Sequence, residues 1–213
     1  MRYLILTLML FASSANAGGI LILGDSISNG YSRYVEAALP CAKRIPHNVR
    51  DSVYFWQHMN GWMEGEDTDT IYFNVGMWDL AHRDKSSDHP YVLVDASKYP
   101  VANIPAVYEA FLTLIVEDFQ KTYPRAKLIF ALTTDVPEGS FGRNPEDVAV
   151  YNSIARKVMA RHMVQVDDLN AWMDGYDFLH VNNHGNLVHY NAQGYQLLAE
   201  EVTRTLIESG GCH

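Results

Sequence analysis

Hydrophobic residues along this chain fall into short continuous runs that alternate with longer stretches of helical spacing. Short apolar runs bounded by glycine or polar residues predict strands that are buried on both faces, and these runs occupy residues 19–24, 70–75, 127–132 and 164–166. Apolar residues at helical spacing cover residues 31–39, 53–63, 105–122, 147–163 and 192–207. This alternation predicts an α/β fold in which helices cover both faces of a parallel sheet.

The same pattern indicates one folded domain. No internal repeat, low-complexity segment or linker interrupts it, and a chain of 213 residues is short for two domains. Residues 81–104 are polar and contain proline, which predicts a long loop. In parallel sheets, functional residues lie in the loops that leave the carboxyl ends of the strands. Candidate chemistry is therefore expected in residues 24–30, 46–52, 74–84, 133–145 and 175–191.

The first 17 residues have the pattern of a leader rather than of a folded element. Arg2 supplies a positive charge, residues 3–12 are apolar, and residues 13–17 end in a small-residue A-x-A pattern. This order is typical of a secretory signal peptide cleaved before Gly18, and the apolar run is too short to span a bilayer. We expect residues 18–213 to form a single domain that is secreted or periplasmic.

Composition and charge narrow the possible partners. The chain is 48% hydrophobic, which fits a globular core, and its 16 Lys and Arg against 25 Asp and Glu give a net charge of −9. An acidic chain without a basic run is a poor binder of nucleic acid or of an anionic membrane. Cys41 and Cys212 are too few for a disulfide scaffold or a four-cysteine zinc site. In an oxidising compartment they could form one disulfide; two separate thiols are the alternative.

The loop after the first predicted strand carries the most specific chemical signal. Residues 24–30 read GDSISNG, so Ser26 follows a buried strand and precedes a helix. A hydroxyl in that place is exposed beside the N–H groups of a helix N-terminus, which suits a nucleophile whose tetrahedral oxyanion needs donors. Helix capping by Ser26 or Ser28 is the alternative interpretation.

Three segments in the same order resemble the SGNH (GDSL-type) hydrolases. Residues 24–28 (GDSIS) resemble the opening motif of that family, residues 74–80 (NVGMWDL) its Gly-x-Asn-Asp segment, and residues 188–195 (VHYNAQGY) its final histidine motif. Residues 133–139 (TTDVPEG) resemble a bacterial branch of the same superfamily. The resemblance spans nearly the whole mature chain. It implies a three-layer, flavodoxin-like α/β/α fold and ester hydrolysis without a metal or an organic cofactor.

The resemblance also implies roles for two residues. Ser26 would attack the acyl carbon, and His189 would take its proton and pass it to the leaving alcohol. We expect the substrate to be a small-molecule or carbohydrate ester, with an O-acetyl or a short acyl group, and we expect a monomer. A catalytically weak relative that binds an acylated glycan or a similar ligand is the alternative.

The chain departs from the family pattern three residues before the histidine. The family usually has an Asp there, whereas this chain has Asn186. An amide can accept from the imidazole N–H but cannot stabilise imidazolium as a carboxylate does. The favoured interpretation is a Ser–His dyad whose histidine is oriented by Asn186 or a backbone carbonyl. Asp174, Asp177 and His184 remain alternatives.

The expected oxyanion hole is altered as well. Beside the amide of Ser26, the family uses an Asn side chain at the position that Trp78 occupies here. The indole N–H of Trp78 or the amide of Asn74 could donate instead. The family's other donor is a glycine N–H after the second strand, and residues 47–52 (HNVRDS) contain no glycine. The backbone N–H of Arg50 could serve there, and its guanidinium could bind an anionic substrate.

The remaining polar groups of these loops point less clearly to chemistry. The histidines show no compact metal-ligand spacing, so no metal site is expected. Arg143 and Asn144 could contact a substrate, although Asn144 is slightly better explained as a helix cap.

Overall fold

The computed structural model describes residues 19–89 and 92–212. The expected leader, residues 1–17, therefore lies outside the described residues. Within the described part of the chain, no helix is long and apolar enough to cross a membrane.

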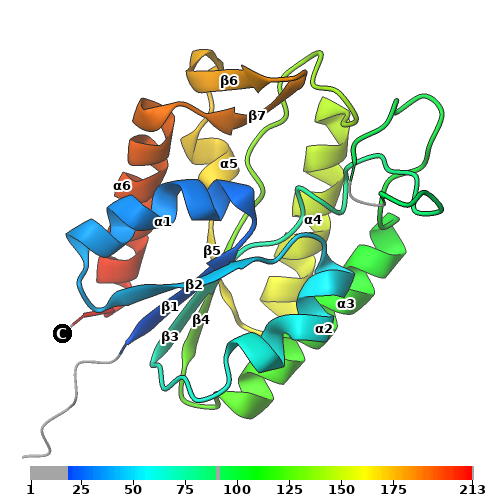
Figure 1. Cartoon of the computed structure of the whole chain (residues 1–213). Coiled ribbons are helices and arrows are strands. Elements are labelled where there is room, and N and C mark those ends of the chain that lie inside the picture. Colours follow the sequence, from blue (N-terminus) through cyan, green and yellow to red (C-terminus); the bar gives the residue numbers. More distant parts are fainter. Residues whose placement is uncertain (1–18, 90–91, 213) are drawn as a thin grey trace, which may run out of the picture.

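A five-stranded parallel sheet forms the middle of the molecule (Figure 1). Its strands are β1 (Ile20–Gly24), β2 (Ala42–Asn48), β3 (Thr70–Phe73), β4 (Lys127–Ala131) and β5 (Gln165–Asp167). They lie in the order β2-β1-β3-β4-β5, and every residue of β1 and β3 is buried, as expected of apolar strands between two helical layers. Because all five strands are parallel, their carboxyl ends all lie at one edge of the sheet.

Helices cover both faces of this sheet, as Figure 1 shows. One face carries α1 (Ser26–Ala38) and α6 (Ala192–Glu208), which pack against each other. The other face carries α2 (Ser52–Trp62), α3 (Pro105–Thr122) and α4 (Pro145–Arg161), and a short helix, α5 (Leu169–Trp172), follows β5. The predicted three-layer α/β/α fold with a central parallel sheet is thus confirmed.

Strand β2 has no continuous apolar run, and only part of it is buried. It contains Pro46, which cannot donate a backbone hydrogen bond. Because β2 lies at the edge of the sheet and pairs only with β1, a residue without an N–H group is tolerated there.

Helix α1 begins five residues before the predicted stretch 31–39. Asp25 caps it, since its carboxylate accepts a hydrogen bond of 2.9 Å from the backbone N–H of Ile27. The first turns contain Ser26, Ser28 and Gly30, which hide the helical spacing of apolar residues. As a result, Ser26 is the first residue of the helix.

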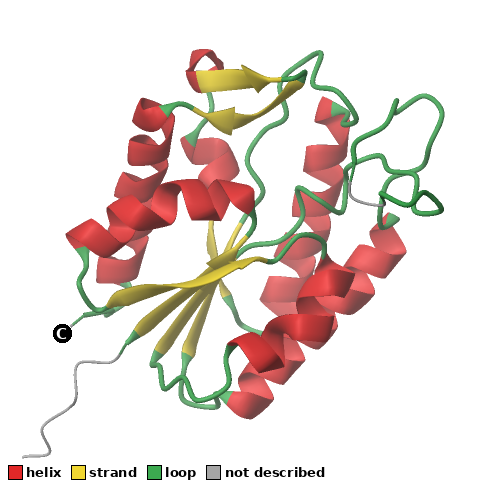
Figure 2. Cartoon of the chain, in the orientation of Figure 1, coloured by secondary structure: helices red, strands yellow, loops and turns green. Residues whose placement is uncertain are grey.

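Residues 175–191, expected to be a loop, contain a small antiparallel hairpin outside the main sheet (Figure 2). A single 3₁₀ turn (Asp177–Leu179) leads into β6 (His180–Asn183), which pairs with β7 (Asn186–Tyr190). His184 and Gly185 connect the strands with φ angles of 52° and 84°. Two consecutive positive φ angles define the two-residue turn whose twist matches that of a hairpin.

Residues 81–104 form a long connection with no helix among its described residues. Both ends are fixed, because the N–H of Ala102 donates to the carbonyl of Ala81 at 2.7 Å and the N–H of Asn103 to that of Asp79 at 3.0 Å. The connection therefore begins and ends beside the loop that follows β3.

Cys41 and Cys212 form a disulfide, with their Cα atoms 5.8 Å apart and 171 positions between them in sequence. Cys41 precedes β2, and Cys212 follows α6. The carbonyl of Cys41 also accepts from the N–H of Ile20 at 3.0 Å. The disulfide therefore fixes the end of α6 to the edge of the sheet where the strands begin.

Candidate active site

The loop after β1 places Ser26 at the edge where the strands end. Asp25 and Ser26 follow β1 directly, and the end of β3 lies beside them. A Cβ atom at Gly24 would overlap the Oδ1 of Asn74 and the side chain of Ser28. Glycine at this position therefore allows β1, β3 and the start of α1 to approach one another closely.

His189 lies beside Ser26 although the two are 163 positions apart in sequence. The Nε2 of His189 and the Oγ of Ser26 are 2.9 Å apart, within hydrogen-bond distance, and both side chains are half-buried. Strand β7 carries the histidine and α1 carries the serine, so the hairpin and the main sheet meet at this contact. A nucleophile and a base require this distance.

The other ring nitrogen of His189 has no hydrogen-bond partner within residues 19–89 and 92–212, although it is buried. The structure does not bring Asn186 to it, because the Oδ1 of Asn186 faces Nη1 of Arg143 at 3.3 Å. Residues three apart in a strand point to opposite faces, and both residues belong to β7. The structure likewise gives Nδ1 no contact with a backbone carbonyl or with Asp174, Asp177 or His184.

A buried guanidinium, that of Arg143, contacts Asn186 on the strand that carries His189. Arg143 donates from Nε to the carbonyl of Met77 at 3.1 Å, and its side chain joins the loop after β3 to strand β7. Burial lowers the pKa of Arg143 to about 10. The pKa of His189 is lowered by burial first, and then by the charges of Arg143 and His180. The ring beside Ser26 is therefore held in its neutral form.

Asn74 lies at the end of β3 and is buried, and its Oδ1 has no hydrogen-bond partner among the described residues. Burial raises the pKa of Asp25, while the amide of Ile27 and the side chain of Asn74 act in the opposite direction. Asn74 is thus close to the turn that carries Ser26. The N–H of Ser26 is one of the first in α1 and has no partner in the helix itself.

Arg50 and Trp78, the other candidate oxyanion donors, make contacts with neighbouring residues. Arg50 has a φ of 54°, a conformation that glycine adopts without strain, and its N–H already donates to Oδ1 of Asn48 at 2.9 Å. Its guanidinium lies 4.7 Å from the ring of Tyr54. The carbonyl of Trp78 accepts from Arg83 at 2.9 Å. Among the candidate side-chain donors, Asn74 lies beside Gly24 and Asp25, in the turn that leads to Ser26.

Asp79 was not singled out by sequence reasoning, yet it joins two of the loops at the site. Its carboxylate accepts from the N–H of Ser52 at 3.0 Å, from the hydroxyl of Ser52 at 2.5 Å and from the side chain of Asn103 at 2.8 Å. Burial, together with the charge of Asp51, raises the pKa of Asp79 to about 7. The loop after β3 is thereby fixed to the first turn of α2.

Two other histidines, His82 and His180, have partners of their own. His82 lies 3.1 Å from the side chain of Asn144, and His180 lies 3.0 Å from Asp135. Asn144 occupies the N-cap position of α4, but its side chain makes no capping bond. In the part of the chain that the structure describes, no group of three or more His, Cys, Asp or Glu side chains is arranged to hold a metal ion.

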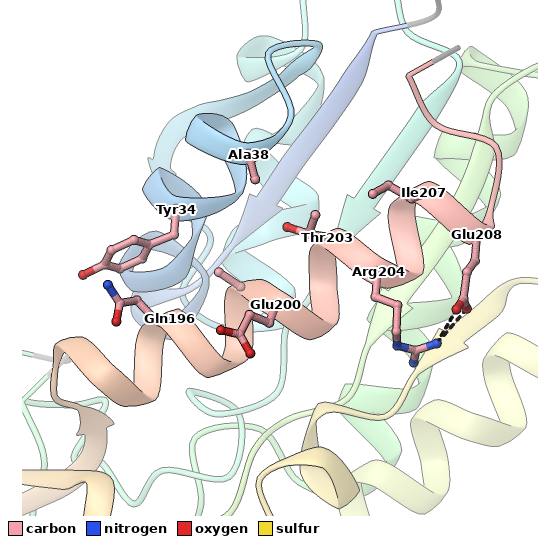
Figure 3. A pocket seen from close by; sticks show the side chains of 9 residues that line it. Tyr34, Ala38, Gln196, Glu200, Thr203, Arg204, Ile207 and Glu208 are labelled. Atoms are coloured by element: carbon pink, nitrogen blue, oxygen red, sulfur yellow. Dashed lines mark hydrogen bonds and ion pairs between the residues drawn. The ribbon is translucent and has the colours of Figure 1, made fainter.

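Two cavities differ in their relation to Ser26. A largely apolar cavity of about 790 Å³ lies between α1 and α6, and Figure 3 shows Tyr34, Gln196 and Ile207 along it. None of its lining residues belongs to the site. A second cavity, of about 460 Å³, is lined mainly by residues 138–146 and includes Arg143. Arg143 is the site residue among its lining, and neither Ser26 nor His189 lines it.

The chain has the fold of the SGNH (GDSL-type) hydrolases, in which a parallel sheet is covered by helices on both faces. Among solved structures, it is similar to an acetyl xylan esterase (16% identity, TM-score 0.66, 88% of this chain and 99% of the other). It is also similar to a lipase/acylhydrolase from Enterococcus faecalis (16% identity, TM-score 0.66, 90% of this chain and 96% of the other). A third similar structure is that of a member of the lipolytic protein G-D-S-L family from Veillonella parvula DSM 2008 (17% identity, TM-score 0.61, 89% of this chain and 98% of the other).

These similarities are visible in the structure rather than in the sequence. No protein-family model matches the sequence, and no curated protein matches it. At identities of 16–17%, the likeness establishes the fold.

Proposed function

We propose that this protein is a serine ester hydrolase that works through Ser26 and His189. The observation that carries the proposal is the 2.9 Å contact between Oγ of Ser26 and Nε2 of His189 at the carboxyl edge of the sheet. As Oγ forms a bond to the acyl carbon, its proton moves to Nε2. The proton then leaves with the alcohol, and water, activated by the same nitrogen, releases the acid and restores Ser26.

The negative charge on the acyl oxygen needs donors close to Ser26. The N–H of Ser26 is available at the start of α1, and the side chain of Asn74 lies beside the same turn. Neither donor is charged, and both are on elements held by the main sheet. This pair supports acyl transfer without a metal or an organic cofactor.

The base works without a carboxylate on its second nitrogen. When Nε2 accepts from Ser26, the ring proton is on Nδ1, which is buried and has no acceptor among the described residues. A Ser–His dyad of this kind stabilises the imidazolium less than a triad does. We expect turnover to be slower than in a hydrolase with the usual Asp.

We favour small acyl esters, with an O-acetyl or a short acyl group, as substrates. The cavity that includes Arg143 is also lined by Asp95, Glu138 and Glu146, whose oxygens suit the hydroxyl groups of a carbohydrate. One solved structure of similar fold is named an acetyl xylan esterase. An acetylated carbohydrate is accordingly the first substrate class to test.

Residues 1–17 act as a secretory signal in this proposal, and the mature chain works in the periplasm or outside the cell. The positive start, the apolar run and the A-x-A pattern support this location. The disulfide between Cys41 and Cys212 also favours an oxidising compartment.

The test is hydrolysis of p-nitrophenyl acetate, butyrate and octanoate by the chain that begins at Gly18. Ser26→Ala is expected to lower turnover by about a thousandfold or more, since it removes the attacking atom. Ser28→Ala is the matched control, because Ser28 is buried in the same helix and its hydroxyl has no hydrogen-bond partner among the described residues. Equal turnover by the wild type and Ser26→Ala would overturn the assignment.

A second function is favoured by one observation: among the described residues, Nδ1 of His189 has no carboxylate or other hydrogen-bond partner. A catalytically weak protein that binds an acylated glycan would keep this fold, and it would not need a carboxylate to stabilise the imidazolium of His189. A folded wild type that hydrolyses none of the three esters, yet binds an acetylated oligosaccharide in a calorimetric titration, would support this alternative over the esterase.

A further inference from the structure

The hairpin that carries His189 reaches the main sheet through the loop between β4 and α4. At one end of the hairpin, the N–H of Phe141 donates to the carbonyl of Gly185 at 2.8 Å, and the N–H of Leu187 contacts the hydroxyl of Ser140 at 3.3 Å. These contacts hold the turn of the hairpin. They do not involve the opposite end of the hairpin, where His189 lies.

Asp135 contacts both strands at that other end. Its Oδ2 lies 3.0 Å from Nε2 of His180 on β6, and its Oδ1 accepts from the hydroxyl of Tyr190 on β7 at 2.7 Å. The rings of His180 and Tyr190 also pack together, with their centroids 4.1 Å apart. One carboxylate, placed four residues after β4, therefore joins both strands to the main sheet.

The register of the hairpin explains why this contact matters for His189. His180 lies opposite Tyr190, and Val181 lies opposite His189. Residues directly opposite each other share a face, and successive residues alternate between faces. One face of the hairpin therefore meets Asp135, while the other face directs His189 toward Ser26.

Asp135 is suited to hold this position because it remains ionised. Burial alone would raise the pKa of Asp135, but hydrogen bonds from His180 and Tyr190 lower it below its ordinary value. A charged acceptor forms shorter and stronger hydrogen bonds than a neutral one. The side chain of His180 is almost fully buried, so water competes little for this contact.

Within the part of the chain that the structure describes, no side chain forms a hydrogen bond with Nδ1 of His189. Its orientation must therefore come from the backbone of β7 and from packing. We infer that Asp135 is a positioning residue that holds the His180–Tyr190 face of the hairpin, so that His189 stays within reach of Ser26. This inference rests on the proposed function, because it assigns Asp135 to the same reaction.

The experiment compares Asp135→Asn and Tyr190→Phe with Tyr72→Phe as the matched control. Tyr72 also donates its hydroxyl to an aspartate at 2.7 Å, Oδ2 of Asp167, but it lies in β3 and does not contact the hairpin. Two readouts are used: the rate at which a p-nitrophenyl phosphonate labels Ser26, and kcat and KM for p-nitrophenyl acetate. Labelling needs the activated serine but not the natural substrate.

Asp135→Asn is expected to slow labelling and to lower kcat by on the order of tenfold to a hundredfold, the cost of a small misplacement of a reacting group. KM should stay within about twofold, because Asp135 is not assigned a contact with substrate. Tyr190→Phe should give a smaller loss, and Tyr72→Phe should label at the wild-type rate. A fall in thermal stability alone would not produce this split between kcat and KM.

Two outcomes separate the inference from the function on which it rests. If Ser26 of the wild type is not labelled and no ester is hydrolysed, the proposed function fails, and the role of Asp135 fails with it. If the wild type is labelled and folded Asp135→Asn and Tyr190→Phe react at the same rate, only the positioning role is overturned. If Asp135→Asn does not fold, Tyr190→Phe decides by the same criterion.

Discussion

His189 is surrounded by groups that keep its ring neutral. Burial lowers its pKa, and the buried guanidinium of Arg143 adds to the effect. A base must be unprotonated to accept the hydroxyl proton of Ser26, so a lowered pKa keeps the base available in mild acid. In the proposed reaction, the same environment makes the imidazolium less stable once it forms, which would limit the maximal rate.

A pH profile tests this electrostatic arrangement. We expect kcat/KM for p-nitrophenyl acetate to fall only at a pH below 6.5, the ordinary pKa of histidine. Arg143→Gln removes a positive charge that opposes protonation, so the acid limb of the profile should move to higher pH. Arg33→Gln, on the exposed surface of α1, should leave it in place. An acid limb that does not move in Arg143→Gln would contradict this account.

Sequence reasoning found the residues whose motifs imply a catalytic role and missed those whose role depends on register. Ser26 and His189 were identifiable because each occupies a family motif at a strand-end loop. Asp135 was not, since its partners become neighbours only when β6 and β7 pair. Asn186 was a candidate because the family has an Asp at that position, but a strand directs the side chains of Asn186 and His189 to opposite faces.

Among the elements, the apolar strands and the longer helices were the easiest to predict. The expected helix at residues 105–122 coincides with α3, because Pro105 starts it and its apolar spacing is regular. The hairpin was missed, although His184-Gly185 between two short strands is a turn of the kind that glycine favours. Its strands are short and polar, so they lack the apolar runs that identified the main sheet.

The disulfide acts at the level of elements, since it joins the end of α6 to the start of β2. Cys41→Ala/Cys212→Ala is expected to lower the free energy of unfolding by roughly 2–5 kcal/mol, because a long loop is no longer closed in the unfolded chain. Activity should be unchanged in the folded protein, as the bond lies at the opposite edge of the sheet from Ser26. Thermal and urea unfolding of the oxidised protein and the variant would measure the difference; identical midpoints would contradict it.

The molecule as a whole buries several carboxylates that are easier to protonate when folded. Burial raises the pKa of Asp79 to about 7 and that of Asp167 to about 6, and it also raises the pKa of Asp25. Each value exceeds the 3.8 of an ordinary Asp side chain. Between 3.8 and these values, the folded state holds protons that the unfolded state has lost. Stability therefore decreases as the pH rises through this range.

We expect the melting temperature to be higher at about pH 5 than at about pH 8, despite the opposite contribution of His189. Asp79→Asn should reduce the difference, because position 79 then no longer titrates. Asp88→Asn, on the exposed part of the long connection, is the matched control and should leave this difference in melting temperature unchanged. Thermal unfolding followed by circular dichroism, at several values between about pH 5 and about pH 8, would measure the melting temperatures. A melting temperature that rises toward pH 8 would contradict the assignment.

The separation of 163 positions between Ser26 and His189 has a consequence for biosynthesis. The ribosome makes the serine and all five strands of the main sheet before it reaches the histidine. A polypeptide that terminates early, anywhere ahead of residue 189, carries the nucleophile without its base. Under the proposed function, ester hydrolysis would therefore require translation past residue 189, and nonsense mutations across most of the gene would give the same inactive phenotype.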